Sequence, residues 1–496
     1  MGAVLPTVVI VGGGLGGLSA ACHLASTHKV VVLERALVPG GRAGLIAEGG
    51  YRFDPGPSVL TMTGILSDTF AAAGAHMNDF VRIHPVDPMY RAVFDASEGG
   101  GEFRVRHGRE AMTEEIRTFA GTAEAQAFIR FADWLTKLYE VETPNFIDRN
   151  FDSVLDLARP LRPALELLRL GGFDRLGRIV KKYFRDPRLQ KIFSFQAMYA
   201  GLAPAQALGA YAIITYMDTI AGVYFPEGGM HAVSVGLAAA ASAAGVEIRY
   251  GANVERVVRD GATGKVRGTR LDDGEFVSAD SVVINADLPV AYQRLVPDLS
   301  APARVRRATY SPSCVLWLAG ARGPVPPGAA HHNIHFGGQW NEAFAALMKH
   351  GTRMPDPSIL VSVPTLSDPH LAPHDRHILY VLEPTPHLGG QIRWDEERVA
   401  IRADLAKRTG ELGYPDDIEV ERFFDPTDWE RMGMAMGTPF GLSHRFSQTG
   451  PFRPANTDGR APGLVFVGSS TVPGVGVPMV LLSGRLAALR VREMTS

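Results

Sequence analysis

The sequence has few cysteines and almost no net charge. Of its 496 residues only Cys22 and Cys314 are cysteines, and they lie far apart. This number argues against a disulfide framework and a cysteine-based metal site, and it is typical of a reducing compartment. The chain carries 50 lysines and arginines against 52 aspartates and glutamates, a formal net charge of −2. That balance gives no field to attract nucleic acid, so we expect neither a metal nor a nucleic-acid partner.

Long uninterrupted apolar runs are also missing. Residues 201–217 come closest, but proline, glycine and glutamine interrupt them, so we expect no bilayer span. The first apolar run, at residues 7–11, lacks the charged segment that precedes the core of a secretory signal. With 46% hydrophobic residues the chain has the composition of a globular protein with a large core. These features predict a protein that is soluble or lies on a membrane surface.

The strongest pattern is a strand, a glycine-rich turn and a helix near the start of the chain. Residues 7–11 (TVVIV) predict a buried strand, and the turn that follows satisfies G-x-G-x-x-G at Gly12, Gly14 and Gly17. Gly12 allows the tight turn, Gly14 lets the backbone approach a pyrophosphate, and Gly17 lets helix and strand pack closely. The helix N-terminus offers free N–H groups to the diphosphate. A βαβ unit with an ordinary glycine turn is the alternative.

The acid that closes the second strand decides part of the cofactor's identity. Glu34 follows the predicted strand at residues 29–33 and can accept the hydroxyls of an adenosine ribose. An acid here favours a free 2′-hydroxyl, as in FAD or NAD, over a 2′-phosphate, although Arg35, a further candidate for binding the cofactor, stands beside it. The complete strand, helix, strand and acid therefore predict a dinucleotide site rather than a plain glycine turn.

Two further turns favour FAD over NAD. Gly41 and Arg42 follow the second strand, and Gly56, Pro57 and Ser58 come shortly after. A plain NAD dehydrogenase has no need for these turns, whereas a flavin lies across the whole domain and needs small residues and an arginine along it. At these residues the chain resembles the flavin amine oxidase and phytoene desaturase superfamily, in which both turns contact FAD.

A second strand-to-helix turn rich in glycine stands near the end of the chain. Residues 464–467 predict a buried strand, 480–491 a helix, and the sequence between them is GSSTVPGVGVPM. Such a turn again offers backbone amides and the positive end of a helix dipole, so we expect a flavin contact rather than a simple connection. The residues predicted to make it are Gly468, Gly476, Val477 and Pro478.

The middle of the chain contributes two more predicted cofactor residues. Residues 246–250, 252–258 and 281–286 predict strands, and Asp287 ends the third. By resemblance to flavoproteins with two dinucleotide-binding motifs, this block returns to the nucleotide domain, and the backbone of Val254 lies against the adenine.

The region between these blocks is helical and then strongly apolar. Residues 123–142 predict a helix with an aromatic core stripe. Residues 159–188 carry nine basic residues against three acids, with an apolar helical face that includes Leu176, Val180 and Phe184. This pattern fits a basic amphipathic helix on an anionic membrane or a core-packed helix with a solvated basic face. Residues 201–225 contain a single charge, Asp218, and should be buried or line an apolar cavity.

Taken over its whole length, the chain resembles the bacterial-type phytoene desaturases, most closely those of actinobacterial carotenoid pathways. The stretches that carry the resemblance are FSFQAMYAG (193–201), YFPEGGM (224–230), YVLEPTPHLG (380–389), GTPFGLSHRFSQTGPFRP (437–454) and the C-terminal turn. The resemblance implies stepwise, FAD-dependent dehydrogenation of phytoene, a C40 polyene, towards lycopene. It also implies a quinone or oxygen as electron acceptor and a place on the cytoplasmic face of the membrane; the oligomeric state stays open.

The predicted fold class is α/β, with a Rossmann-type FAD-binding domain, a mixed-sheet substrate domain and an inserted helical region. We assign residues 1–85, 226–290 and 455–496 to the first, 86–118 and 291–454 to the second, and 119–225 to a membrane-facing or lid region. Candidates for catalysis are Asp148, Arg149 and Asp218. An adjacent Asp–Arg pair is commonly a surface ion pair, and an acid alone in an apolar run can have a raised pKa.

Three alternative functions stay open at this point. A relative of the same family could act on another carotenoid as a desaturase, a ketolase or an isomerase. A non-enzymatic escort of prenylated proteins could keep the fold, although it would not need both glycine-rich turns. An amine oxidase would need a polar amine site, for which the sequence gives no signal.

Overall fold

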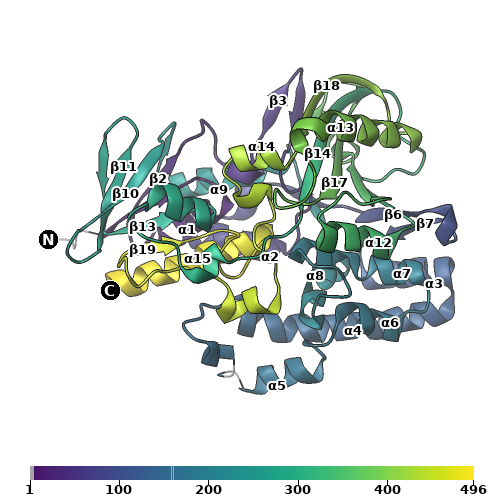
Figure 1. The fold of residues 1–496 in the computed structure, drawn as a ribbon, viewed down its shortest axis with the longest axis horizontal. Helices are drawn as coiled ribbons and strands as arrows, with labels where there is room; N and C mark the ends of the chain where they lie inside the picture. Colours follow the sequence, from purple (N-terminus) through teal and green to yellow (C-terminus); the bar gives the residue numbers. More distant parts are fainter. Residues whose placement is uncertain (1–4, 158, 160) are drawn as a thin grey trace.

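The computed structural model describes residues 5–157, 159 and 161–496, so that residues 1–4, 158 and 160 of the predicted first and third parts lie outside it. A five-stranded sheet lies on one side of the molecule and a seven-stranded sheet on the other (Figure 1). Every pair in the smaller sheet is parallel. In spatial order its strands are β19 (Leu464–Phe466), β13 (Ser281–Ile284), β1 (Thr7–Val11), β2 (Lys29–Glu34) and β9 (Glu247–Tyr250).

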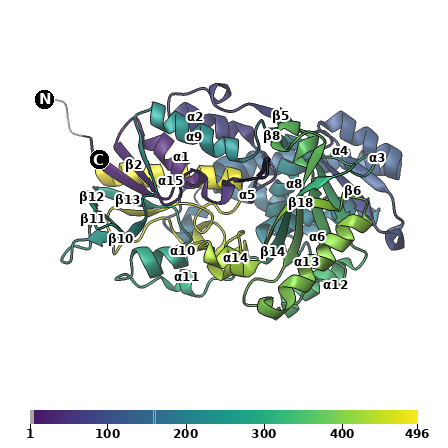
Figure 2. The ribbon, with the colours of Figure 1, turned by 90° about the horizontal axis from the view of Figure 1, so that it is seen from above.

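The two faces of this parallel sheet belong to two separate cores. On β1, Val8 and Ile10 point to one face and Val9 and Val11 to the other, as the two-residue period of a strand requires. The helices that cover the first face are α1 (Leu15–Leu24), α9 (His231–Ala243) and α15 (Val477–Thr495), and α2 (Thr63–Ala72) packs on α1 and α15. The antiparallel strands that cover the second are β10 (Val254–Arg259), β11 (Val266–Leu271) and β12 (Phe276–Ser278) (Figure 2). A parallel sheet covered on both faces reads as continuous Val and Ile runs, which is what the sequence shows.

The second sheet is mixed. Its strands in spatial order are β18 (Asp417–Phe424), β14 (Ser313–Arg322), β17 (Arg376–Thr385), β16 (Ile359–Ser362), β15 (His332–Phe336), β6 (Tyr90–Phe94) and β7 (Glu102–Val105). Only the β15–β6 pair is parallel among these described strands. Helix α13 (Trp394–Glu411) covers one face, where Trp317 and Val381 are buried, and the opposite face carries Leu316 and Tyr380. The predicted α/β fold with a mixed-sheet second module is confirmed.

Helices fill the space beside the second sheet. In chain order they are α3 (Arg109–Ala120), α4 (Thr122–Glu142), α5 (Leu161–Arg169), α6 (Leu176–Tyr183), α7 (Pro187–Ile192) and α8 (Ala212–Tyr216). The predicted aromatic stripe of α4 is buried, with Phe128 and Phe131 wholly inaccessible. Shorter elements are α10 (Leu288–Val290), α11 (Ala303–Arg306), α12 (Trp340–Ala345), α14 (Pro426–Arg431), β3 (Ile46–Glu48), β4 (Tyr51–Phe53), β5 (Ile83–Pro85) and β8 (Tyr224–Pro226).

Within residues 159–188 the structure decides between the two interpretations for α6 only. This stretch forms three short helices rather than one, and Leu176, Val180 and Phe184 are buried in the main core. The apolar face of α6 therefore packs against the protein, so it cannot lie in a membrane. The amphipathic pattern alone cannot tell these cases apart, because a core and a bilayer both accept the same apolar face.

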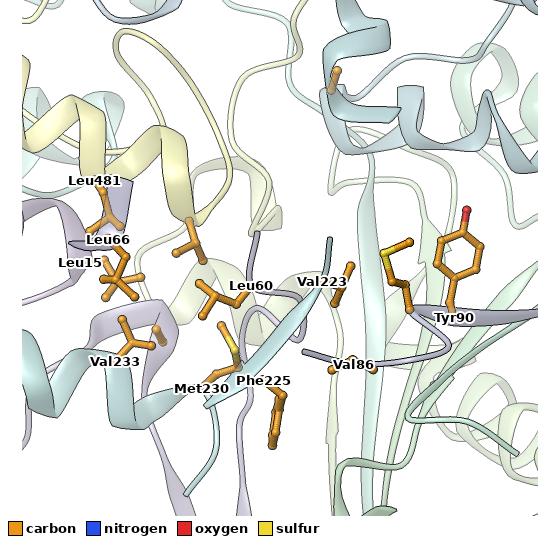
Figure 3. Packing of buried hydrophobic residues seen from close by; sticks show 14 of the residues in the cluster. Leu15, Leu60, Leu66, Val86, Tyr90, Val223, Phe225, Met230, Val233 and Leu481 are labelled. Carbon is orange, nitrogen blue, oxygen red and sulfur yellow. The ribbon is translucent and has the colours of Figure 1, made fainter. Parts of the chain in front are cut away.

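The hydrophobic core on the first face of the parallel sheet extends to the second sheet and so connects the two halves of the molecule. Figure 3 shows Leu15, Leu66 and Leu481, which come from α1, α2 and α15, packed together on one side, and Val86, Val223 and Tyr90 on the other, with Leu60 and Phe225 between them. The antiparallel pair β5–β8 runs through this junction. No helix among the described residues is long and apolar enough to cross a bilayer.

Candidate functional site: a dinucleotide pocket opening into an apolar chamber

One cavity of about 1210 Å³ joins the parallel sheet to the mixed sheet. It starts at the carboxyl ends of β1 and β2, where Gly12 and Glu34 line it, and it reaches Tyr380 and Trp340 on the far side. Carboxyl ends of parallel strands are where open α/β sheets bind ligands, because the adjoining loops diverge there.

Almost all the cofactor residues predicted from the sequence line this cavity. They are Gly12, Gly14, Glu34, Arg35, Gly41, Arg42, Gly56, Pro57, Ser58, Val254, Asp287, Gly468, Gly476, Val477 and Pro478. Gly17 is the exception, and its surroundings explain it: a Cβ there would lie 2.1 Å from the Gly12 carbonyl oxygen. Gly17 thus permits close packing of α1 on β1, as predicted, and contact of the other residues with the cofactor stays a prediction.

Two helix N-termini with no side-chain cap meet at the cavity. The N-cap of α1 is Gly14 and that of α15 is Gly476; neither receives a capping hydrogen bond from a side chain, and both residues line the cavity. Free backbone N–H groups and the positive ends of two helix dipoles suit an anion. These residues fit the diphosphate of FAD, and they come from opposite ends of the chain.

Backbone hydrogen bonds hold the Glu34 carboxylate in a position that suits a nucleoside. Its Oε2 accepts a hydrogen bond from the Gly13 N–H at 2.6 Å, and its Oε1 accepts one from the Ala36 N–H at 2.8 Å. The side chain is buried, so these bonds hold it in one orientation. A carboxylate offers about four acceptor positions, so two bonds to the backbone leave room for the ribose hydroxyls.

Arg42 ties its own turn to the end of β13 and to the C-terminal turn. Its guanidinium pairs with Asp287 at 2.7 Å and donates to the Ser469 hydroxyl at 2.6 Å. Asp287 accepts two further bonds, from the Ser470 hydroxyl at 3.1 Å and from the Ala435 N–H at 3.0 Å. Asp287 was predicted to bind the cofactor, and the structure shows that it positions Arg42 and the C-terminal turn.

The structure places the three catalytic candidates in different environments, and only one of them lines the cavity. Asp148 forms an ion pair with Arg485, and Arg149 lies over the ring of Phe151; neither candidate lines the cavity. Asp218 does line it, on a π-helical turn at Met217–Ala221. π-Helical turns are rare in proteins overall, but where they occur they are often at functional sites.

Asp218 has the environment of a proton carrier. Its side chain is buried, and its Oδ2 has no hydrogen-bond partner. Burial raises the pKa of Asp218 to about 7, while a hydrogen bond with Gln196 opposes the rise. A group with this pKa is present in both protonation states near neutral pH, which suits acid–base work.

Sequence analysis missed three polar residues of the cavity wall. Glu142, Tyr211 and His444 line the cavity and are more than nine-tenths buried. For Glu142 a signal was available, because it falls on the apolar stripe of α4, seven residues after Leu135 and four after Leu138. Tyr211 lies in the run 201–225 that was expected to be buried or to line an apolar cavity, and His444 lies in the stretch 437–454 that carries the family resemblance, but no periodicity singles out either residue.

Comparison with known proteins agrees with this site. Residues 15–492 match the model of the family described as flavin containing amine oxidoreductase. A phytoene dehydrogenase of Streptomyces griseus is 45% identical over 98% of this chain and 94% of its own. A zeta-carotene-forming phytoene desaturase of Myxococcus xanthus is 36% identical over 97% and 93%. An oxidoreductase structure from Methanosarcina mazei covers 98% of this chain and 100% of its own, with a TM-score of 0.64 at 18% identity, which shows the fold alone.

Glycine-rich turns at both ends of the chain, two free helix N-termini on one cavity and these matches lead to one conclusion. The chain belongs to the flavin-containing amine oxidoreductase family, and FAD is its cofactor.

Proposed function

We propose that this protein is an FAD-dependent desaturase that converts phytoene stepwise towards lycopene. The observation that carries this proposal is the single cavity that joins a dinucleotide site to a long, mostly apolar chamber. A C40 polyene has no polar group, so apolar burial must bind it. Relatives over nearly the whole chain are named for phytoene dehydrogenation or desaturation.

Residues of the chamber have distinct roles in this reaction. Bound FAD would supply the acceptor for hydride from the polyene. The apolar walls, including Phe195, Ile214 and Leu360, exclude water and align the polyene. Asp218 is placed to take the proton that leaves the neighbouring carbon. Tyr380 donates a hydrogen bond to the Gly56 carbonyl at 2.9 Å and so holds the turn between the two parts of the cavity.

Expression in cells that accumulate phytoene tests the proposal directly. We expect pigment extracts to contain lycopene or an intermediate on the way to it, identified by chromatography and absorption. Unchanged phytoene, from folded protein with FAD bound, would contradict the proposal and point to another carotenoid or to an isomerase.

The mouth of the chamber supports docking on a membrane. Around α5 several large apolar side chains are exposed by 46% to 72%, which is unusual for a soluble surface. They are Leu155, Leu161, Leu165, Leu168, Phe173 and Phe446. Phe173 and Phe446 also line the cavity and meet edge to face at 6.1 Å. Figure 1 shows α5 at the margin of the molecule.

Exposed cations accompany this apolar surface. They are Arg162, Arg169, Arg175, Arg178, Lys181, Lys182 and Arg445. Apolar side chains beside basic ones are typical of proteins that lie in an anionic membrane interface. A membrane is also where phytoene and a quinone dissolve, so the substrate would enter the chamber from the lipid. With two buried, unpaired cysteines suited to a reducing compartment, we place the protein on the cytoplasmic face.

A vesicle assay tests this docking surface. We expect the purified protein to sediment with phosphatidylglycerol vesicles and to be released in part at high salt, because salt screens exposed charges. The L161D/L168D variant should lower the partition coefficient at least about tenfold, since each leucine contributes about 1.5–3 kcal/mol when buried. The control is Val399→Asp, at a still more exposed position on α13, away from this surface. Equal binding of both variants, or binding of neither the wild type nor the variants, would contradict this docking surface.

A further inference from the structure

The segment that follows α14 forms a strap, residues 432–435, along the cavity wall. Its residues that line the cavity are Met432, Gly433 and Met434. Glu34 and Val254, which were predicted to lie against the ribose and the adenine, line the same cavity. α14 itself is attached to the mixed sheet, because the indole N–H of Trp429 donates a hydrogen bond to the Cys314 carbonyl at 2.9 Å. Figure 2 shows α14 between the two halves of the molecule, so the strap lies where the mixed sheet meets the nucleotide domain.

A glycine ends α14 and sets the path of the strap. Gly433 has φ +93°, a left-handed conformation that glycine adopts readily. Its N–H donates to the Glu430 carbonyl at 2.8 Å, and the N–H of Met434 donates to the Trp429 carbonyl at 3.0 Å. These two bonds close the last turn in the way that is common where a helix ends at glycine. The turn therefore has one defined shape, and it brings Met432 and Met434 to the cavity wall together.

Arg35 joins the strap to the nucleoside end of the cavity. Its Nη2 donates a hydrogen bond to the Met432 carbonyl at 2.9 Å. Met432 is the C-cap residue of α14, so its carbonyl has no partner within the helix. A cation at this position also suits the negative end of the helix dipole. Because Arg35 directly follows Glu34, whose carboxylate is held by two backbone N–H groups, the strap lies beside the predicted ribose position.

A second hydrogen bond fixes the other end of the strap. Oδ2 of Asp287 accepts it from the Ala435 N–H at 3.0 Å, while Oδ1 of Asp287 pairs with Arg42 at 2.7 Å. Asp287 lies shortly after β13 and Arg35 directly after β2, so both anchors come from the carboxyl edge of the parallel sheet. The strap thus belongs to the mixed-sheet module by chain connection, but it is bonded at each end to the nucleotide domain.

We propose that the strap closes the FAD site over the adenosine half of the cofactor, with Met432 and Met434 as cofactor-binding residues and Arg35 as the positioning residue that holds them there. Thioether side chains are flexible and polarizable and make favourable contacts with aromatic rings such as adenine. The glycine turns and Glu34 suit the diphosphate and the ribose, but they offer no side chain to the adenine. The inference rests on FAD as the cofactor and not on the identity of the polyene.

The first test measures cofactor affinity without any turnover. FAD and ADP, which carries only the adenosine half, are each titrated by calorimetry into protein stripped of its cofactor. Arg35→Met removes the donor but keeps a long side chain. We expect it to raise both dissociation constants about fivefold or more, the loss typical of a hydrogen bond from a charged donor. Arg35→Lys, which can still donate one bond, should recover most of the affinity.

The matched control for this test is Arg431→Met. Arg431 lies on α14, one position before Met432, is exposed, and pairs with Asp428. An exposed ion pair of this kind contributes little, so both dissociation constants should stay within about twofold of the wild type.

Hydrogen exchange of the strap gives a readout that a merely structural role of Arg35 would not produce. The N–H groups of Gly433, Met434 and Ala435 are all hydrogen-bonded, so their exchange reports on opening of the strap. We expect bound FAD to slow this exchange in the wild type, measured by mass spectrometry, and to slow it much less in Arg35→Met. A purely structural effect would change the exchange equally with and without FAD.

Three results would overturn the proposal. If Arg35→Met stays within about twofold of Arg431→Met in FAD affinity, Arg35 does not hold a part of the cofactor site. If bound FAD leaves the exchange of the strap unchanged in the wild type, the strap does not close on the cofactor. If ADP fails to bind the wild type, or if Arg35→Met weakens FAD but not ADP, the strap does not act on the adenosine half.

Discussion

Asp218→Asn should abolish polyene turnover while FAD stays bound. The side chain is buried in the chamber with one carboxylate oxygen free, and an amide of the same shape cannot take a proton. Proton transfer by a placed side chain contributes about 10²- to 10⁴-fold to a rate, so we expect kcat to fall at least about a hundredfold. Flavin absorbance and product chromatography measure the two properties on one sample. The control, Asp174→Asn, removes an exposed acid and should leave turnover unchanged.

The pH profile gives this prediction a signature that a structural role would not show. Because the pKa of Asp218 is about 7, kcat should rise through neutral pH as the base loses its proton. The free energy of unfolding should change with pH in the opposite direction to kcat. The folded protein keeps this proton to about pH 7, while the unfolded chain loses it near pH 3.8, so the free energy of unfolding falls as pH rises between them. Asp218→Asn should remove this contribution; turnover near the wild-type level would rule Asp218 out as the proton acceptor.

Gly17→Ala should release FAD and destabilise the fold. The added methyl carbon would sit 2.1 Å from the Gly12 carbonyl oxygen, so α1 must move away from β1, and the phosphate-binding turn must move with it. Overpacking of this kind costs about 1–3 kcal/mol, which outweighs the gain in helix propensity of about 1 kcal/mol. We expect the FAD dissociation constant to rise at least about tenfold, measured by ultrafiltration, and the unfolding midpoint to fall.

A second helical glycine provides the matched control. Gly64 lies in α2, is exposed, and an added Cβ would meet no atom within 4 Å. Gly64→Ala should therefore leave FAD binding unchanged and stabilise the helix slightly. Equal behaviour of the two variants would mean that close packing at Gly17 does not shape the cofactor turn.

The sequence by itself determined the parts of this protein that depend on local pattern. Strand, glycine turn, helix and Glu34 lie within the first 34 residues, and each residue's role follows from its neighbours in the chain. The aromatic stripe of α4 was predictable for the same reason, because periodicity is a local signal. Family resemblance extended this to FAD and to the carotenoid class.

Only the tertiary structure decided which polar residues face the chamber. Asp148, next to Arg149, and Asp218, alone in an apolar run, were both candidates from the sequence, yet the first pairs with Arg485 and the second lies in the cavity wall with no hydrogen-bond partner for its Oδ2. The same holds for α5 and α6: Leu161, Leu165 and Leu168 of α5 are exposed, while Leu176, Ile179 and Val180 of α6 are buried, although both helices are amphipathic and basic. Burial and pairing depend on residues hundreds of positions away, such as Arg485 beside Asp148, and no local pattern encodes that contact.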